Sequence, residues 1–383
     1  MGRWMKRIGL ALLALVVLAG GAALWKRDEI GRLMAVNSLF AEDRIIHNFS
    51  HMDEAFLHVP LSEGPGVDLP TGPATPLPDE AAAWIDARAV TALVVLKDGQ
   101  ITHESYYLGT GPDDLRISWS VAKSFLSLLT GILIDEGALT LTDPVTLHVP
   151  ALIGTAYDGA TVEDVLQMES GAQFDEDYFN PDSDINRMGR VIALGGALDE
   201  FTAEISERDR EPGAAMKYVS MDTHVLGMVL RGATGRSIPD LMAEKLTGPM
   251  GMGPAYFLTD GEGVAFVLGG INMRTRDYAR MGQLVLQGGQ MNGRQIVPRA
   301  WIGASTMPSA KTRAGGMQYG YQWWMPSDAR PGELQAQGVY GQFVYIDKAR
   351  NVVIAVNAAD RGFRGDGVME QNIDMFRRIA AAQ

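Results

Sequence analysis

The sequence predicts a mixed α/β (α+β) fold in which helices flank an antiparallel sheet and a mainly helical lobe is inserted. One strand pair lies early in the chain, at 91–96 and 101–108, and the Asp98-Gly99 turn between them is typical of a β-hairpin. A second pair lies near the end, at 343–346 and 352–356. We expect both pairs to share one sheet, with the intervening residues forming the lobe.

Helical patterns fill the sequence between the two strand pairs. Residues 125–136 are apolar on nearly every face, which predicts a buried central helix that ends at Gly137. The other segments with helical periodicity are 162–168, 224–233, 238–246, 277–287 and 367–381.

The composition is that of a globular protein with a sizeable core. The chain has 383 residues, of which 46% are hydrophobic and 21% charged, and its formal net charge is −13. This acidic balance argues against nucleic acid and anionic lipid head groups as partners. The absence of cysteine excludes disulfides, thiolate metal sites and a cysteine nucleophile.

Residues 1–27 have the pattern of a membrane anchor or a signal segment. The apolar run 8–25 is flanked by basic residues on both sides and would span about 27 Å as a helix, close to the hydrocarbon thickness of a bilayer. This length favours an uncleaved anchor with the body outside the cytoplasm, in the periplasm. The small residues at 19–23 leave a cleaved signal peptide, and hence a secreted protein, as the alternative.

Residues 28–78 are expected to connect this segment to the folded body. They begin with a polar helical stretch, and 59–78 is rich in proline and glycine, which predicts an extended linker. We therefore expect the folded domain to cover residues 79–383.

The only S-x-x-K in the chain is Ser120 with Lys123. Residues three apart lie on one face of a helix, so the hydroxyl and the amine can meet. Burial at the start of the apolar helix would lower the pKa of the lysine toward that of a general base, and the helix N-terminus could stabilise an oxyanion. Alternatively, Ser120 only caps the helix and Lys123 is solvated. Spacing and context alone leave both readings open.

Ordered motifs over residues 80–380 strengthen the first reading. The chain resembles the serine β-lactamase-related hydrolases, a superfamily that includes class C β-lactamases and penicillin-binding proteins, and most of all its 6-aminohexanoate-dimer hydrolase branch. The resemblance implies a β-lactamase/transpeptidase-like fold. The segments that carry it are 118–124, 131–137, 141–145, 166–171, 177–178, 182–184, 226–227, 233–237, 269–272, 276–280, 319–324 and 338–342.

The resemblance implies roles for the residues of three motifs. Ser120 would be the nucleophile and Lys123 its activating lysine. In the second motif, Lys217–Ser220, Tyr218 would relay a proton to the leaving group, which requires the nearby Lys123 charge to lower the pKa of its phenol. Ser220 would orient Lys123 or the ligand by hydrogen bonding.

The third motif departs from the family pattern. The matching stretch is Val339–Gln342, in which Gly341 would allow close approach of the substrate and the Gln342 N–H would join that of Ser120 as oxyanion donor. The cationic residue that grips a β-lactam carboxylate is missing, which argues against penicillin hydrolysis. The stretch Lys311–Arg313 resembles this motif only superficially and is interpreted as a solvated loop.

Several aromatic and acidic residues are further candidates for the pocket. Tyr178 matches a family position that contacts the substrate amide, and Tyr340 is expected to bind substrate. Asp184 is a weaker candidate. Trp323 and Trp324 could line the pocket or pack in the core.

The sequence thus predicts a serine hydrolase that cleaves a linear amide or ester bond in a small-molecule substrate through an acyl-enzyme. The alternatives are a penicillin-binding-like module for cell-wall peptides or a D-alanyl peptidase, and a scaffold without activity. No cofactor is expected, since the chain has no P-loop and no dinucleotide fingerprint. No metal is expected either, because His47 and His51 have helical spacing but no third ligand near in sequence.

Overall fold

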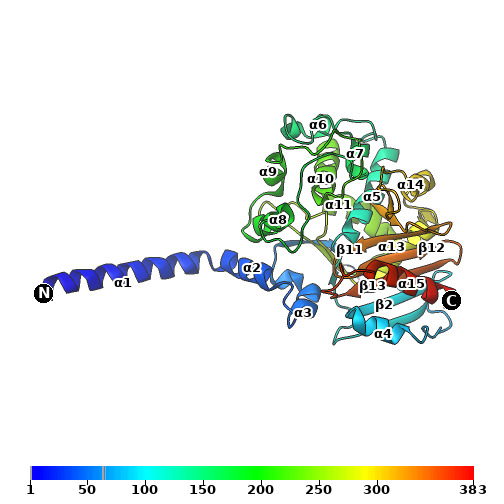
Figure 1. Ribbon diagram of the computed structural model, residues 1–383, viewed down its shortest axis with the longest axis horizontal. Coiled ribbons are helices and arrows are strands. Elements are labelled where there is room, and N and C mark those ends of the chain that lie inside the picture. The colour runs from blue at the N-terminus through cyan, green and yellow to red at the C-terminus, as the bar shows by residue number, and fades with distance from the viewer. Residues whose placement is uncertain (1, 63, 65) are drawn as a thin grey trace.

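The computed structural model describes residues 2–62, 64 and 66–383, and it has the predicted mixture of helices and antiparallel sheet (Figure 1). Within these residues, a seven-stranded sheet forms the base of the body. Both predicted strand pairs are confirmed as neighbours in this sheet. Its strands, in spatial order, are β3 (Gln100–Tyr106), β2 (Val90–Lys97), β13 (Val352–Ala358), β12 (Gln342–Asp347), β11 (Glu333–Gly338), β10 (Trp323–Met325) and β9 (Gln318–Gly320).

Helices cover both faces of the sheet. On one face lie α4 (Ala81–Ala87) and α15 (Val368–Ala382), where Trp84 and Phe376 pack on β2, β12 and β13. On the other face lie α5 (Val121–Asp135) and α13 (Thr275–Leu286), which belong to the largest apolar cluster. Every residue from Val121 to Leu133 is buried, which explains why α5 lacks a polar face.

The helical lobe lies beside α5 at the top of Figure 1. Its central helix is α10 (Ser220–Thr234), which Gly235 ends in a left-handed conformation. The remaining helices are α6 (Val145–His148), α7 (Val162–Leu166), α8 (Asp184–Ala193), α9 (Leu198–Ala203), α11 (Ile238–Met242), α12 (Gly248–Met250) and α14 (Arg299–Ser305). A short hairpin joins β7 (Gln290–Met291) to β8 (Arg294–Gln295).

A second sheet of four short strands includes the start of the segment that was predicted to be a linker. Its order is β1 (His58–Ser62), β5 (Ala255–Leu258), β6 (Ile271–Met273) and β4 (Arg116–Ile117). The expected linker 59–78 thus begins as a strand of the folded body. Pro60 is tolerated because β1 pairs only with β5, at the edge of the sheet. Pro65, which also belonged to that expectation, lies outside the described residues.

The segment before β1 also packs into the body. After α2 (Arg27–Ser38), the chain turns through α3 (Ile45–Ser50), and the side chains of Leu39, Phe49 and Phe56 are buried against the lobe. The expected start of the body at residue 79 is therefore too late. Scattered apolar residues between polar ones do not reveal such packing in the sequence.

Helix α1 (Gly2–Trp25) projects away from the body (Figure 1). Residues 4–21 form a window of 18 residues with mean hydropathy 1.6, and none of this window is buried against the protein. The helix is thus long and apolar enough to cross a membrane, as a signal sequence near the N-terminus also is.

Candidate active site

Ser120 lies at the N-terminus of α5, after a residue with an unusual backbone. Trp119 has φ +41°, a conformation that side chains other than glycine rarely adopt and that costs energy. The Ser120 side chain makes no capping hydrogen bond with the helix. Its hydroxyl is therefore not used as a helix cap, contrary to the alternative left open by the sequence.

Lys123 reaches back over one helical turn to this hydroxyl. Its Nζ lies 2.9 Å from Ser120 Oγ and donates a hydrogen bond to the Leu268 carbonyl at 2.7 Å. The lysine is only 2% exposed, and burial lowers its pKa from the ordinary value to about 7, although the charge of Glu176 opposes this shift. A lysine in this state can accept a proton from the adjacent hydroxyl near neutral pH.

Tyr218 lies near Lys123, as predicted, but its pKa is shifted in the opposite direction from the prediction. Lys123 Nζ lies 5.4 Å from the centre of its ring, and Trp324 packs on the ring at 5.7 Å. Burial, and next the charge of Glu176, raise the pKa of the phenol above its ordinary value. The expectation that Lys123 lowers this pKa is therefore wrong, since burial and Glu176 dominate and Lys123, with a pKa of about 7, is only about half protonated at neutral pH.

Glu176 ties the second motif to Tyr178. Its carboxylate accepts a hydrogen bond from the Tyr178 hydroxyl at 2.8 Å and another from the Ser220 amide. Burial and this carboxylate raise the pKa of Tyr178. Glu176 was not singled out from the sequence, and only its position two residues before Tyr178 could have indicated a role.

The third motif lies three residues earlier than the sequence reading placed it. A Cβ atom on Gly338 would come within 3.0 Å of the Ser120 amide nitrogen, so here the strand backbone approaches the candidate nucleophile. A Cβ on Gly341 would instead meet Ala358, and the Gln342 side chain is buried with its amide donating to the Ala358 carbonyl at 2.7 Å. Gly341 and Gln342 thus face away from the site.

Two backbone amide groups beside Ser120 also indicate that the third motif lies at Gly338. Within the part of the chain that the structure describes, neither the Ser120 N–H nor the Val339 N–H donates a hydrogen bond. Val339 follows Gly338 directly and lines the cavity beside Ser120. The sequence missed this register because Gly338 and Gly341 fit the glycine of the motif equally well.

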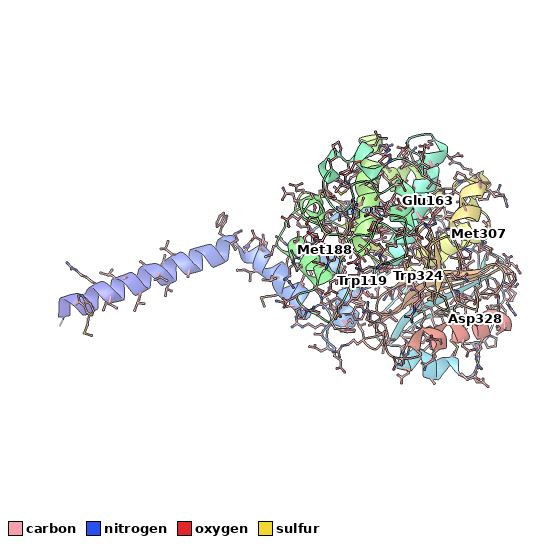
Figure 2. All side chains as sticks on the ribbon, turned by 45° about the horizontal axis from the view of Figure 1, so that its top comes forward. Trp119, Glu163, Met188, Met307, Trp324 and Asp328 are labelled. Carbon is pink, nitrogen blue, oxygen red and sulfur yellow. The ribbon has the colours of Figure 1, made fainter. Side chains whose placement is uncertain are left out.

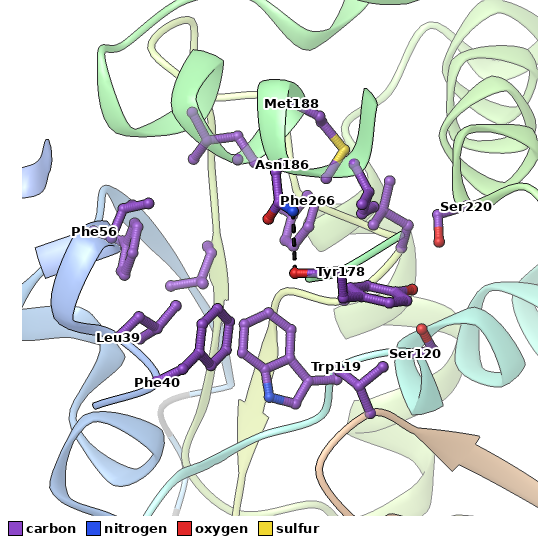
Figure 3. Close-up of a pocket in the computed structure, with 18 of the residues that line it drawn as sticks. Leu39, Phe40, Phe56, Trp119, Ser120, Tyr178, Asn186, Met188, Ser220 and Phe266 are labelled. Atoms are coloured by element: carbon purple, nitrogen blue, oxygen red, sulfur yellow. Dashed lines mark hydrogen bonds between the residues drawn. The ribbon is translucent and has the colours of Figure 1, made fainter. Parts of the chain in front are cut away.

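Ser120 lies where two cavities meet. One has a volume of about 300 Å³ and includes Tyr218, Trp324 and Arg364 in its walls. The other, of about 120 Å³, is mainly apolar and is lined by Trp119, Tyr340 and residues of the N-terminal segment and α8 (Figure 3). Tyr178, Val339 and Ser120 border both.

The remaining candidates divide between the site and its surroundings. Tyr340 lines the apolar cavity, with its ring stacked on Phe40 at 4.7 Å. Trp324 lines the other cavity, whereas Trp323 is fully buried in the core. Asp184 accepts a hydrogen bond from the Asp175 amide and so supports the loop that carries Tyr178.

Other polar groups that the sequence analysis weighed lie outside this site. Lys311 is largely exposed beside Glu169. His47 and His51 do have a third potential metal ligand, Glu54, with the ligand atoms within 4.8 Å of one another, and all three side chains are exposed. Sequence spacing alone did not reveal this cluster.

The family relationship follows from a comparison over most of the chain. A family model described as Beta-lactamase matches residues 80–374. The chain belongs to the β-lactamase family. A relative in the same family, the 6-aminohexanoate-dimer hydrolase of Paenarthrobacter ureafaciens, is 30% identical over 296 residues, which cover 73% of this chain and 75% of that protein.

Solved structures confirm the β-lactamase-like fold. A Bacillus anthracis protein assigned as a 6-aminohexanoate-dimer hydrolase superposes with a TM-score of 0.79 at 22% identity, covering 89% of this chain and 95% of that one. EstCE1, a hydrolase with promiscuous acyltransferase activity, gives a TM-score of 0.63 at 16% identity, covering 79% and 95%. At these identities the likeness concerns the fold.

Asp222 is a buried acidic residue that lies outside the walls of both cavities. It is buried in α10, accepts hydrogen bonds from Ser170 Oγ at 2.7 Å and from the Tyr157 hydroxyl at 3.2 Å, and burial raises its pKa to about 8. The folded state therefore holds this proton between about pH 4 and pH 8, where the unfolded state has released it. The stability contribution of this group is full below pH 4 and is lost as the pH rises through 8.

Asp222→Asn is expected to prevent this loss of stability at high pH, because asparagine resembles the protonated acid. The free energy of unfolding of the variant should exceed that of the wild type at pH 8 to 9, by up to about 5 kcal/mol if the full pKa shift is recovered. Urea denaturation at pH 5 and at pH 9 measures the difference. A variant that is less stable at both pH values would show that Asp222 is ionised and needed as an anion.

Proposed function

We propose that this protein is a serine hydrolase that cleaves a linear amide or ester through an acyl-enzyme, in the manner of 6-aminohexanoate-dimer hydrolases and related esterases. The observation that carries the proposal is the contact of 2.9 Å between Lys123 Nζ and Ser120 Oγ, at a helix N-terminus and with a lysine pKa of about 7. Such a pair activates a serine without histidine.

In the first half of the reaction, neutral Lys123 takes the proton of Ser120, and Oγ attacks the substrate carbonyl. The amides of Ser120 and Val339 hold the resulting oxyanion, with Val339 replacing Gln342 in the role that the sequence suggested. Tyr218, kept protonated by its raised pKa, donates its proton to the leaving amine or alcohol, and the Lys123 ammonium reprotonates it.

In the second half, a water molecule occupies the place of the leaving group. Lys123 removes its proton through Tyr218, the hydroxide attacks the acyl carbon, and the bond to Ser120 Oγ breaks as the proton returns to it. Tyr178, Ser220, Tyr340 and the backbone at Gly338 would position the substrate around these atoms, and the reaction uses no cofactor and no metal.

The cavity does not favour a β-lactam. With the register set by Gly338, the position of the missing cation, two residues before this glycine, is Ala336, and Gln337 lies between them; neither side chain is charged. One cation does line the same cavity: Arg364 lies 4.7 Å above the ring of Tyr178. Because a guanidinium can hold a carboxylate, Arg364 supports the second candidate, a penicillin-binding-like module or a D-alanyl peptidase that takes cell-wall peptides.

Covalent labelling separates the two candidates. We expect a fluorophosphonate to label the protein rapidly and a penicillin to leave it unlabelled, as read by intact-protein mass spectrometry. Stable labelling by penicillin would favour the penicillin-binding function instead. An inert protein with both reagents would contradict both and leave a scaffold that has only kept the fold.

We further propose that α1 anchors the domain in the cell membrane as a single span, with the N-terminus in the cytoplasm and the domain on the opposite, periplasmic side. The apolar, uncovered helix supports this arrangement. If the segment is cleaved as a signal, the same domain is secreted.

A further inference from the structure

The apolar cavity beside Ser120 has one wall made by the segment that follows α1. Leu39, Phe40 and Phe56 of this segment face Ile185, Met188 and Ile192 of α8 across the cavity. Figure 3 shows Leu39, Phe40 and Phe56 on one side and Met188 on the other, with Trp119 between them and Ser120. In the whole molecule (Figure 2), Trp119 and Met188 lie on the side of the body that faces the N-terminal helices.

This wall is fixed in place by specific contacts. Arg32 of α2 donates a hydrogen bond to the Ala193 carbonyl at the end of α8 at 2.9 Å, and Asn48 of α3 donates to the Leu39 carbonyl at 3.1 Å. The ring of Phe49 packs edge-on against Trp119 at 5.5 Å. The cavity is thus a built feature of the site and not a gap beneath a loose segment.

The position of Tyr218 assigns the two cavities to the two parts of a substrate. Tyr218 lines only the larger cavity, and it is the proton donor to the leaving group in the proposed reaction, so the leaving group lies there. The acyl part then extends from the reacting carbon to the other side of Ser120. Apart from Ser120, Ser220, Asn186, the Tyr178 and Tyr340 hydroxyls and the Trp119 indole N–H, the side chains on that side are hydrocarbon or methionine.

We propose that this cavity binds an unbranched aliphatic acyl chain, so that the substrates are esters or amides of medium-chain acids. The inference rests on the proposed function and adds the acyl specificity. Burial of each methylene against the apolar walls favours the longer chain, because apolar surface leaves water in the acylation transition state. The cavity has no charged side chain in its walls with which to hold an acyl group that ends in an ammonium or a carboxylate.

Gly189 offers a way to shorten the cavity without disturbing the fold. It lies within α8 and lines the cavity, and a Cβ atom on it would meet nothing within 4 Å. Gly189→Leu places a side chain into this space and also improves helix propensity. The matched control is Gly303→Leu in α14, an exposed helical glycine that also has open space and does not line the cavity.

The test measures kcat/KM of the full chain, reconstituted in lipid nanodiscs, for p-nitrophenyl esters with acyl chains of two to twelve carbons. The octanoyl ester should exceed the acetyl ester at least about 30-fold, since each methylene contributes up to about fourfold. Gly189→Leu should lower this ratio at least about fivefold, and Gly303→Leu should leave it unchanged, which also cancels any effect of partitioning into lipid.

The failure of this inference differs from failure of the proposed function. Fluorophosphonate labelling together with a flat or falling dependence on chain length would overturn the aliphatic acyl pocket and leave the hydrolase standing. Equal ratios in both leucine variants and the wild type would also overturn it. An unlabelled protein that hydrolyses no ester would overturn the proposed function itself.

Discussion

Ser120→Ala is expected to lower kcat/KM for p-nitrophenyl esters by at least about 10⁴-fold, because the variant has no atom that can form the acyl-enzyme. KM should change little, since the walls of both cavities remain. The loss should persist at every pH between 6 and 9, because no other group takes over the attack. Steady-state kinetics on the purified full chain measure it.

The matched control is Ser127→Ala, two helical turns further along α5. Ser127 is fully buried like its neighbours, and its hydroxyl has no hydrogen-bond partner within the described residues. We therefore expect this variant to keep both the fold and wild-type activity. Turnover by Ser120→Ala at more than a tenth of the wild-type rate would rule out Ser120 as the nucleophile.

The activity should rise with pH as Lys123 loses its proton. Burial lowers the pKa of Lys123 to about 7, so kcat/KM is expected to increase between pH 6 and pH 8 and then to reach a plateau. Lys123→Arg keeps a positive charge that cannot be removed at these pH values, and should cost about 10² to 10⁴ in kcat/KM and abolish the titration. Lys348→Arg, at a partly buried lysine that contacts Thr306, is the control expected to retain both.

Glu176→Gln tests the electrostatic part of this account. The carboxylate of Glu176 raises the pKa of Lys123, so its removal should move the rise in activity to lower pH, by about half a unit or more. The pH dependence of kcat/KM measures this shift, which a purely structural role of Glu176 would not produce. A rise that stays at the wild-type pH would show that Lys123 is not the group that titrates.

Much of the fold was accessible from the sequence because the main sheet and α5 have strong local patterns. The Asp98-Gly99 turn and the alternation on either side of it predict β2 and β3, and the all-apolar run predicts a buried α5. The four-stranded sheet was missed because β4 and β6 have only two and three residues, too few to show a period. The packing of the N-terminal segment depends on tertiary contacts alone.

The candidate site was predictable where its geometry is local. Ser120 and Lys123 are one helical turn apart, so their contact follows from spacing, whereas Tyr218 was found only through a motif. Glu176 and Val339 were missed because their roles arise from the approach of separate segments. The raised pKa of Tyr218 likewise depends on Glu176, which no spacing rule connects to it.

The most direct test of the central claim is to locate the acyl group during turnover. The full chain is mixed with a p-nitrophenyl ester, quenched with acid within the burst of nitrophenol release, digested and sequenced by mass spectrometry. We expect the acyl group on the peptide that contains Ser120, at the Ser120 side chain itself. An acyl group on any other residue, or an unmodified Ser120 after a stoichiometric burst, would contradict the account.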